Sequence, residues 1–144
     1  MQAPLEIHDE VALQAAAATL HDAALVKGDW SFDPSRRLFI LRPWVRERHA
    51  VQPRKSLLRF RRRIWVQRQW EMLVSDVDGF EILVSNEQEF GHLKRFEISD
   101  MQFDAKRGVL GIMTHYVLDI EVYVNRLHCV LEMTEKVEST TPYG

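Results

Sequence analysis

Hydrophobic residues recur along the chain at two spacings, and the first spacing along the chain is typical of a helix. Four apolar residues near the N-terminus share one helical stripe: Leu13, Ala16, Ala17 and Leu20. Asp9 precedes them at the position where a side-chain oxygen accepts a hydrogen bond from the free amides of a first helical turn. The spacing therefore predicts a short amphipathic helix that begins after Asp9 and packs closely through its alanines.

After this helix the apolar spacing changes to two, which is typical of strands with one buried face. Residues 24–32 and 38–44 flank the sequence Asp33-Pro34-Ser35-Arg36, in which the proline favours a type I turn, so a hairpin is predicted. The sharpest alternation covers residues 57–74, where seven of the nine even positions are apolar. We expect one long strand there, with one buried and one solvated face.

The last third of the chain is typical of a meander. Residues 93–103 and 109–124 flank a polar turn, and a bulge is expected near Ser99-Asp100, where the apolar parity switches. A two-residue turn at Asn125-Arg126 would bring four apolar pairs to one face, beginning with Val124 opposite Leu127. We therefore expect the segments before and after this turn to pair with each other.

Together these elements predict an α+β domain, with one N-terminal helix packed on a curved, mainly antiparallel sheet of about six strands. Residues 80–91 fit either a short strand or a turn of helix. Residues 1–137 are expected to form a single domain, and residues 138–144 a flexible polar tail. Because no apolar run is long enough for a membrane span and the first residues lack a secretory pattern, a cytoplasmic location without membrane contact is expected.

Charge is distributed unevenly, although 19 basic and 21 acidic residues give a net charge of only −2. Residues 36–69 hold twelve basic side chains and one acid, Glu47, which makes this basic block +11. Within the block, Arg62 and Arg68 have the parity of a buried face, so each needs either a carboxylate partner or a position where that face reaches solvent. Such asymmetry is evidence about partners or internal pairing rather than about the fold.

The candidate binding residues lie in the middle of this basic block. Three arginines and a tryptophan would project in one row from one strand face, and two further basic residues precede them in an exposed loop: Arg59, Arg61, Arg63 and Trp65, with Arg54 and Lys55. Guanidinium groups beside an indole ring suit a polyanion, because arginine pairs with phosphate and the ring stacks on a base. The alternatives are ion pairs with the chain's own carboxylates and protection of a sheet edge.

Residues capable of acid–base or metal chemistry form no recognisable motif in the sequence. His21-Asp22 is expected to close the first helix, and His115 and Asp119 share the outer face of the meander. The six histidines lack metal-ligand spacing, so neither a metal, a cofactor nor a catalytic residue is predicted. Cys129 is the sole cysteine and lies among apolar residues, which is typical of a small buried side chain.

Residues 13–45 resemble the start of small bacterial domain-of-unknown-function proteins. The residues that carry the likeness are Thr19-Leu20-His21-Asp22-Ala23-Ala24-Leu25-Val26, followed by Asp33-Pro34-Ser35-Arg36-Arg37-Leu38-Phe39-Ile40-Leu41. The resemblance implies a helix followed by a sheet and a bacterial origin. It carries over no functional residue.

The leading functional hypothesis is a non-catalytic protein-binding or self-assembly module that uses the Arg59/Arg61/Arg63 and Trp65 face of its sheet. The alternative is binding of single-stranded nucleic acid or another polyanion through residues 46–68. A third hypothesis is a small enzyme that uses His21/Asp22 or His115/Asp119.

Overall fold

The computed structural model describes residues 3–47 and 65–140, and within these ranges the chain forms eleven strands and two short helices. The helices are α1 (Glu10–Leu20) and α2 (Glu87–His92). The strands are β1 (Leu5–Ile7), β2 (Ala24–Val26), β3 (Trp30–Asp33), β4 (Leu38–Leu41), β5 (Trp44–Arg46), β6 (Trp65–Val74), β7 (Val77–Val84), β8 (Arg95–Asp104), β9 (Val109–Thr114), β10 (Leu118–Val124) and β11 (Cys129–Thr140).

This fold is largely β, so the predicted α+β domain with about six strands is wrong. Short interruptions divide segments whose alternation predicts single strands. Gly28 has a positive φ of 96° between β2 and β3, and Tyr116 has a φ of 60° in the turn between β9 and β10. In residues 109–124 the apolar alternation continues across the turn, which is why the pattern alone does not reveal the break.

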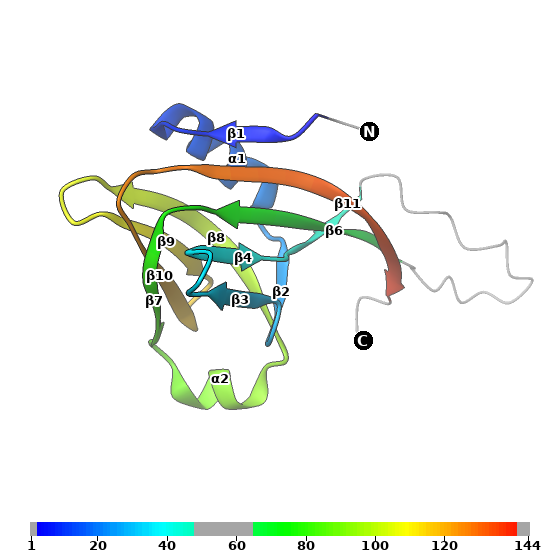
Figure 1. Cartoon of the computed structure of the whole chain (residues 1–144). Coiled ribbons are helices and arrows are strands. Elements are labelled where there is room, and N and C mark those ends of the chain that lie inside the picture. Colours follow the sequence, from blue (N-terminus) through cyan, green and yellow to red (C-terminus); the bar gives the residue numbers. More distant parts are fainter. Residues whose placement is uncertain (1–2, 48–64, 141–144) are drawn as a thin grey trace, which may run out of the picture.

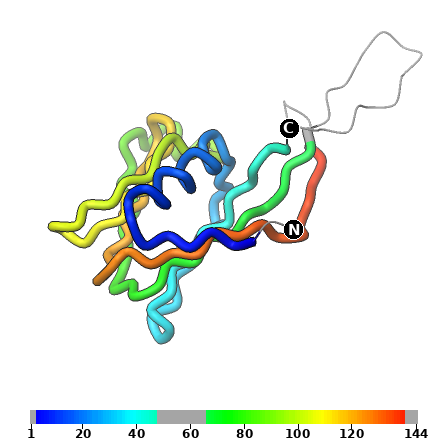
Figure 2. Tube along the Cα trace, turned by 90° about the horizontal axis from the view of Figure 1, so that it is seen from above, coloured from blue at the N-terminus to red at the C-terminus, as the bar shows by residue number. Residues whose placement is uncertain are grey.

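The strands form one antiparallel sheet that curves into two walls. Its order is β1-β11-β6-β5-β2-β8-β9-β10-β7, with β4 paired to β6 and β3 paired to β4. The long strands β11 and β6 lie in one wall, and β9, β10 and β7 lie in the other (Figure 1). Helix α1 packs against β1 and β8 and lies between them in the view from above (Figure 2). Helix α2 lies at the opposite end of the molecule from α1 (Figure 1).

Strand β8 is the corner between the two walls. Its first residues, 95–97, pair with β2, whereas residues from Ile98 onward pair with β9. The register shifts between Ile98 and Asp100, which confirms the predicted bulge. A bulge bends its strand and increases the local twist, so this irregularity lets one strand take part in both walls.

The first helix and the first hairpin agree with the prediction. The Asp9 side chain caps α1 by accepting a hydrogen bond from the Ala12 amide at 2.8 Å. The four residues of the predicted stripe are buried: Leu13, Ala16, Ala17 and Leu20. They join one hydrophobic core with the inward faces of both walls. Strands β3 and β4 pair around the predicted turn, from Trp30 opposite Leu41 to Asp33 opposite Leu38.

Strand β6 has the predicted buried face, but its other face is buried as well over part of the strand. Val66, Met72 and Val74 are buried on the even face. On the odd face, Gln67 and Gln69 are each only 7% exposed, so the expectation of a solvated face is wrong for this part of the strand. The buried amides have partners, because Gln67 accepts a hydrogen bond from Arg95 and Gln69 donates one to the Arg42 carbonyl. The predicted beginning of the strand, residues 57–64, lies outside the described residues.

The predicted pairing across Asn125-Arg126 is wrong. Strand β10 pairs with β9 and β7, whereas β11 pairs with β6 and β1. The chain therefore passes from one wall to the other at Asn125-Arg126. Just before β11 begins, the His128 carbonyl accepts a hydrogen bond from the Ser75 amide at 3.0 Å. Parity fixes which face of a strand is buried but not which strand lies beside it.

Two further segments are defined by the structure. Residues 80–91 contain both predicted alternatives in succession, because β7 ends at Val84 and α2 begins after its N-cap Asn86. Strand β11 continues to Thr140, so residues 138–140 of the expected tail pair with β6 instead. Neither helix in the described parts of the chain has the length and apolar character needed to cross a membrane.

We predict that Leu20→Ala lowers the free energy of unfolding by about 2–5 kcal/mol, because it leaves a cavity between α1 and the sheet. Leu20 is completely buried, whereas Val11 on the same helix is 77% exposed. Val11→Ala is therefore the matched control and should change stability by less than about 0.5 kcal/mol. Urea unfolding monitored by tryptophan fluorescence measures both, and equal effects would contradict the packing of α1.

Candidate functional site

The predicted binding residues are not placed by the structure. Five of them lie in residues 48–64, outside the described ranges: Arg54, Lys55, Arg59, Arg61 and Arg63. For Trp65 the backbone alone is described, at the start of β6 opposite Thr140. The two ends of the segment are neighbours, since the Glu47 amide donates to the Val66 carbonyl at 2.8 Å. Residues 48–64 thus connect two paired strands, β5 and β6.

Three arginines of the basic block that the structure does describe form ion pairs within the chain. Arg37 contacts Asp78 at 2.6 Å and Arg42 contacts Glu71 at 3.2 Å. Arg68 contacts Glu47 at 2.6 Å and also donates to the Thr134 carbonyl. The expectation that Arg68 needs a carboxylate is confirmed, whereas Arg62 lies outside the described residues. Internal pairing therefore accounts for at least part of the basic block.

The carboxylates in these three pairs do not come from the outer face of the C-terminal strands. That face carries Asp119, Glu121 and Glu132. Glu121 contacts Arg107 at 3.9 Å, and Arg107 does not belong to the basic block. The block instead pairs with carboxylates on β6, on β7 and beside β5.

A cluster of two histidines and one aspartate forms where α1 ends. The Asp22 carboxylate lies between both imidazoles, 3.1 Å from His21 Nδ1 and 3.0 Å from His115 Nε2. The two rings meet edge to face, with centroids 6.0 Å apart. His21 is the C-cap residue of α1, in agreement with the predicted capping role. His115 comes from the turn between β9 and β10, 93 residues after Asp22.

Main-chain hydrogen bonds to β8 hold both parts of this cluster. The Asp22 amide donates to the Ile98 carbonyl at 2.8 Å, and the Ile98 amide donates to the Ala23 carbonyl at 2.9 Å. The His115 amide donates to the Glu97 carbonyl at 3.0 Å. Because adjacent residues of one strand anchor both segments, the separation of the two histidines is set by the sheet.

Unusual backbone conformations surround the cluster. Asp22 has a φ of 66°, which aspartate adopts more readily than most residues, and Tyr116 has a φ of 60° directly after His115. The Tyr116 side chain is 90% exposed. The bulge of β8 lies next to both segments. Conformations of this kind persist only where the surrounding structure enforces them, and they often occur at functional sites.

The electrostatics of the cluster favour an ionised aspartate. The hydrogen bond from His115 lowers the pKa of Asp22, and the charges of both histidines act in the same direction, while partial desolvation opposes them. His21 and Asp22 are exposed, and the His115 side chain is 38% exposed. Two imidazoles around a carboxylate can bind a metal ion or transfer a proton. Both kinds of chemistry need access from solvent, which this exposure provides.

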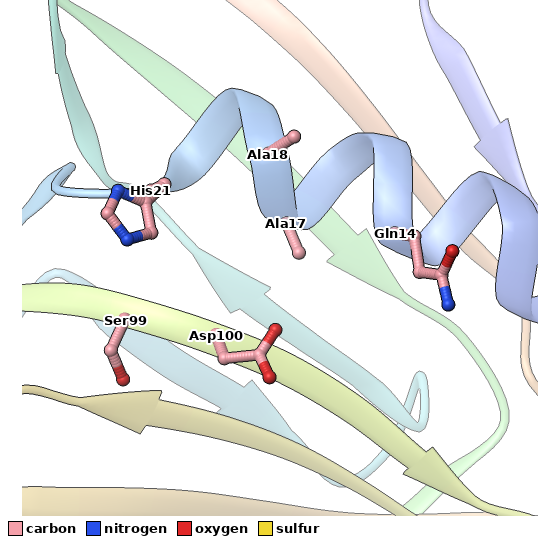
Figure 3. A pocket seen from close by; sticks show the side chains of 6 residues that line it. All are labelled: Gln14, Ala17, Ala18, His21, Ser99 and Asp100. Carbon is pink, nitrogen blue, oxygen red and sulfur yellow. The ribbon is translucent and has the colours of Figure 1, made fainter.

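A shallow depression of about 450 Å³ adjoins the cluster and shares His21 with it. Its other lining residues are Gln14, Ala17 and Ala18 on α1, and Ser99 and Asp100 on β8 (Figure 3). The Ser99 hydroxyl donates to the Met113 carbonyl at 3.2 Å, and Asp100 accepts from the Met101 amide. The small alanine side chains leave room between helix and strand beside His21.

The sequence pattern alone does not bring the three members of this cluster together. It groups His115 with Asp119, whereas Asp119 lies opposite Met113 and lines a different depression, on the outer face of β8, β9, β10 and β7. The signal in the sequence is a His-Asp pair at the end of a helix and a histidine near a strand break. Joining them requires the strand order, because β8 brings the two segments together.

Comparison of the chain with protein-family models, with curated proteins and with solved structures finds no match in any of the three.

We predict that Cys129 does not react with thiol reagents in the folded protein. Its side chain is completely buried, and burial raises the pKa of the thiol to about 12, so the reactive thiolate is disfavoured at pH 8. In a colorimetric thiol assay at pH 8, the native chain should give no rapid signal. The chain in denaturant should give one thiol per molecule. Rapid reaction of the native chain would contradict the burial of this strand.

Proposed function

We propose that this protein is a non-catalytic binding or assembly module that contacts a protein partner or a second copy of itself through residues 48–64 and Trp65. The distribution of charge carries the proposal. Residues 48–64 hold seven basic residues and no acid, while the rest of the chain holds twelve basic and 21 acidic residues, a net −9. A second copy therefore offers a surface of opposite overall charge to this segment.

The ion pairs of the described arginines support this assignment. Arg37, Arg42 and Arg68 are each held by a carboxylate of the same chain. These three side chains would have to break existing contacts to bind a partner. Seven of the other nine basic residues of the block lie in residues 48–64, where the arginines and the adjacent tryptophan are residue types that are enriched at protein interfaces.

The proposal includes a cytoplasmic setting in a bacterium. The lone cysteine supports it, since Cys129 is buried and has no partner for a disulfide within the chain. The resemblance of residues 13–45 to small bacterial proteins supports the source.

Charge reversal of the arginine row tests this function. We expect the wild-type chain to self-associate or to retain a protein partner in a way that weakens with salt, and the triple variant Arg59→Glu/Arg61→Glu/Arg63→Glu to lose this. Trp65→Ala should weaken it as well. Light scattering after size exclusion gives the oligomeric state, and affinity capture from a bacterial lysate with the purified chain gives the partner.

The control for this test matches the change in charge. The triple variant Arg36→Glu/Lys94→Glu/Lys106→Glu reverses three exposed basic residues elsewhere in the chain and should keep the association. A wild-type chain that is monomeric at every concentration, and that captures the same proteins as the arginine variant, would contradict the proposal. So would an equal loss in both triple variants, because that would indicate a dependence on net charge alone.

Binding of single-stranded nucleic acid or another polyanion through residues 46–68 is the second candidate function. The observation that favours it concerns Glu47, the one acid in this range, whose carboxylate is already paired with Arg68 at 2.6 Å. Phosphates approaching the segment would thus meet no unpaired carboxylate from residues 46–68 themselves.

We expect this candidate to give an oligonucleotide affinity that falls steeply between about 50 and 200 mM salt, as counterion release requires. Fluorescence anisotropy with a labelled oligothymidine measures it, and Arg59→Glu/Arg61→Glu/Arg63→Glu should bind at least about tenfold more weakly. Failure of the wild-type chain to be retained on heparin at low salt would exclude the polyanion function.

A further inference from the structure

We propose that His21, Asp22 and His115 form a binding site for a divalent transition-metal ion, for which Zn²⁺ is the probe. Their ligand atoms, one from each side chain, all lie within 4.8 Å of one another. No other group of three or more His, Cys, Asp or Glu side chains in residues 3–47 and 65–140 meets this condition. The inference is independent of the basic segment and of any partner that it binds.

Two of the three donor separations are close to those of a zinc site, and the third is no more than 4.8 Å. Zinc–nitrogen and zinc–oxygen bonds of about 2.0–2.2 Å place tetrahedral ligand atoms roughly 3.3–3.6 Å apart. The carboxylate of Asp22 is 3.1 Å from His21 Nδ1 and 3.0 Å from His115 Nε2. All three side chains are at least partly exposed, so they have room to rotate and bring their donor atoms around an ion.

The donor set selects the class of ion. Imidazole nitrogens suit Zn²⁺, Co²⁺, Ni²⁺ and Cu²⁺, whereas Ca²⁺ and Mg²⁺ prefer sites made of oxygen ligands. One carboxylate and two imidazoles supply a single negative charge and two neutral donors. This composition favours a transition metal over the hard cations that purely acidic clusters bind.

The main chain around the donors is already fixed. Hydrogen bonds to Ile98 and Glu97 of β8 anchor Asp22 and His115, so binding orders side chains but does not have to order the backbone. Three protein ligands leave at least one coordination position for water. The depression that shares His21 with the cluster provides space beside the ion for a water molecule or a small ligand.

A second pair of histidines provides an internal comparison. His8 and His128 stack with ring centroids 4.7 Å apart, and His8 Nε2 is 3.5 Å from Glu6. These three residues also offer imidazole and carboxylate donors, but they do not bring three ligand atoms within the same mutual distance. The structure therefore favours the cluster around Asp22.

Titration of the untagged full chain with ZnCl₂ tests the proposal, in a buffer that does not bind metal and after removal of bound ions with a chelator. Isothermal calorimetry should give one ion per chain, and saturating Zn²⁺ should raise the melting temperature. His21→Ala, His115→Ala and Asp22→Asn should each weaken Zn²⁺ binding by about 10-fold or more. Asparagine tolerates a positive φ, so Asp22→Asn removes the charge without imposing new backbone strain.

His92→Ala is the matched control, because His92 is exposed at the end of α2 and away from the cluster. It should bind Zn²⁺ like the wild type. Absence of saturable binding, unchanged affinity in Asp22→Asn or His115→Ala, or a loss that follows His8→Ala instead would overturn the site.

A measurement on the wild-type chain keeps the test independent of variant folding. Added Co²⁺ should broaden the imidazole proton resonances of His21 and His115 at lower concentration than those of His8, His49, His92 and His128. The reverse order, or equal broadening of all six, would likewise overturn the proposal.

Discussion

The bend in β8 is the constraint on which most of this structure depends. Residues 95–97 pair with β2 in one wall, and residues from Ile98 onward pair with β9 in the other. The register shift between Ile98 and Asp100 bends the strand at this point, which lets it serve both walls. The same corner bonds the end of α1 and the turn before β10 through its own amide and carbonyls. Closure of the core and assembly of the histidine–aspartate cluster thus have a common cause.

The ion pairs of the described part of the chain orient side chains more than they stabilise the fold. A partly exposed pair contributes about 0–1 kcal/mol, because solvent screens the charges and two long side chains must be ordered. Arg37, Arg42 and Arg68 are each held by a carboxylate of the same chain, so each guanidinium is oriented by its partner although the pair adds little to the free energy of unfolding.

Features set by neighbouring residues could be predicted from the sequence, and features set by strand order could not. The Asp9 cap, the hairpin between β3 and β4 and the bulge in β8 each depend on residues close together in the chain. The pairing partner of β10 depends on strand order instead. Both β7 and β11 alternate apolar and polar residues, and it is β7 that lies beside β10, with Ile82 opposite Ile120 and Phe80 opposite Val122. Two candidate partners with equal parity cannot be distinguished by alternation.

The histidine–aspartate cluster also depends on strand order, because β8 brings its two segments together. This dependence determines what a bound metal ion would do to the fold. In small zinc domains the ion organises the chain, and the apoprotein is unfolded. Here Asp22 and His115 are 93 residues apart, but both are already attached to β8 by main-chain hydrogen bonds. The entropy of bringing them together is therefore lost when the sheet forms, whether or not an ion is present. An ion would stabilise the native state only through mass action, so occupancy of the site can change while the fold stays the same.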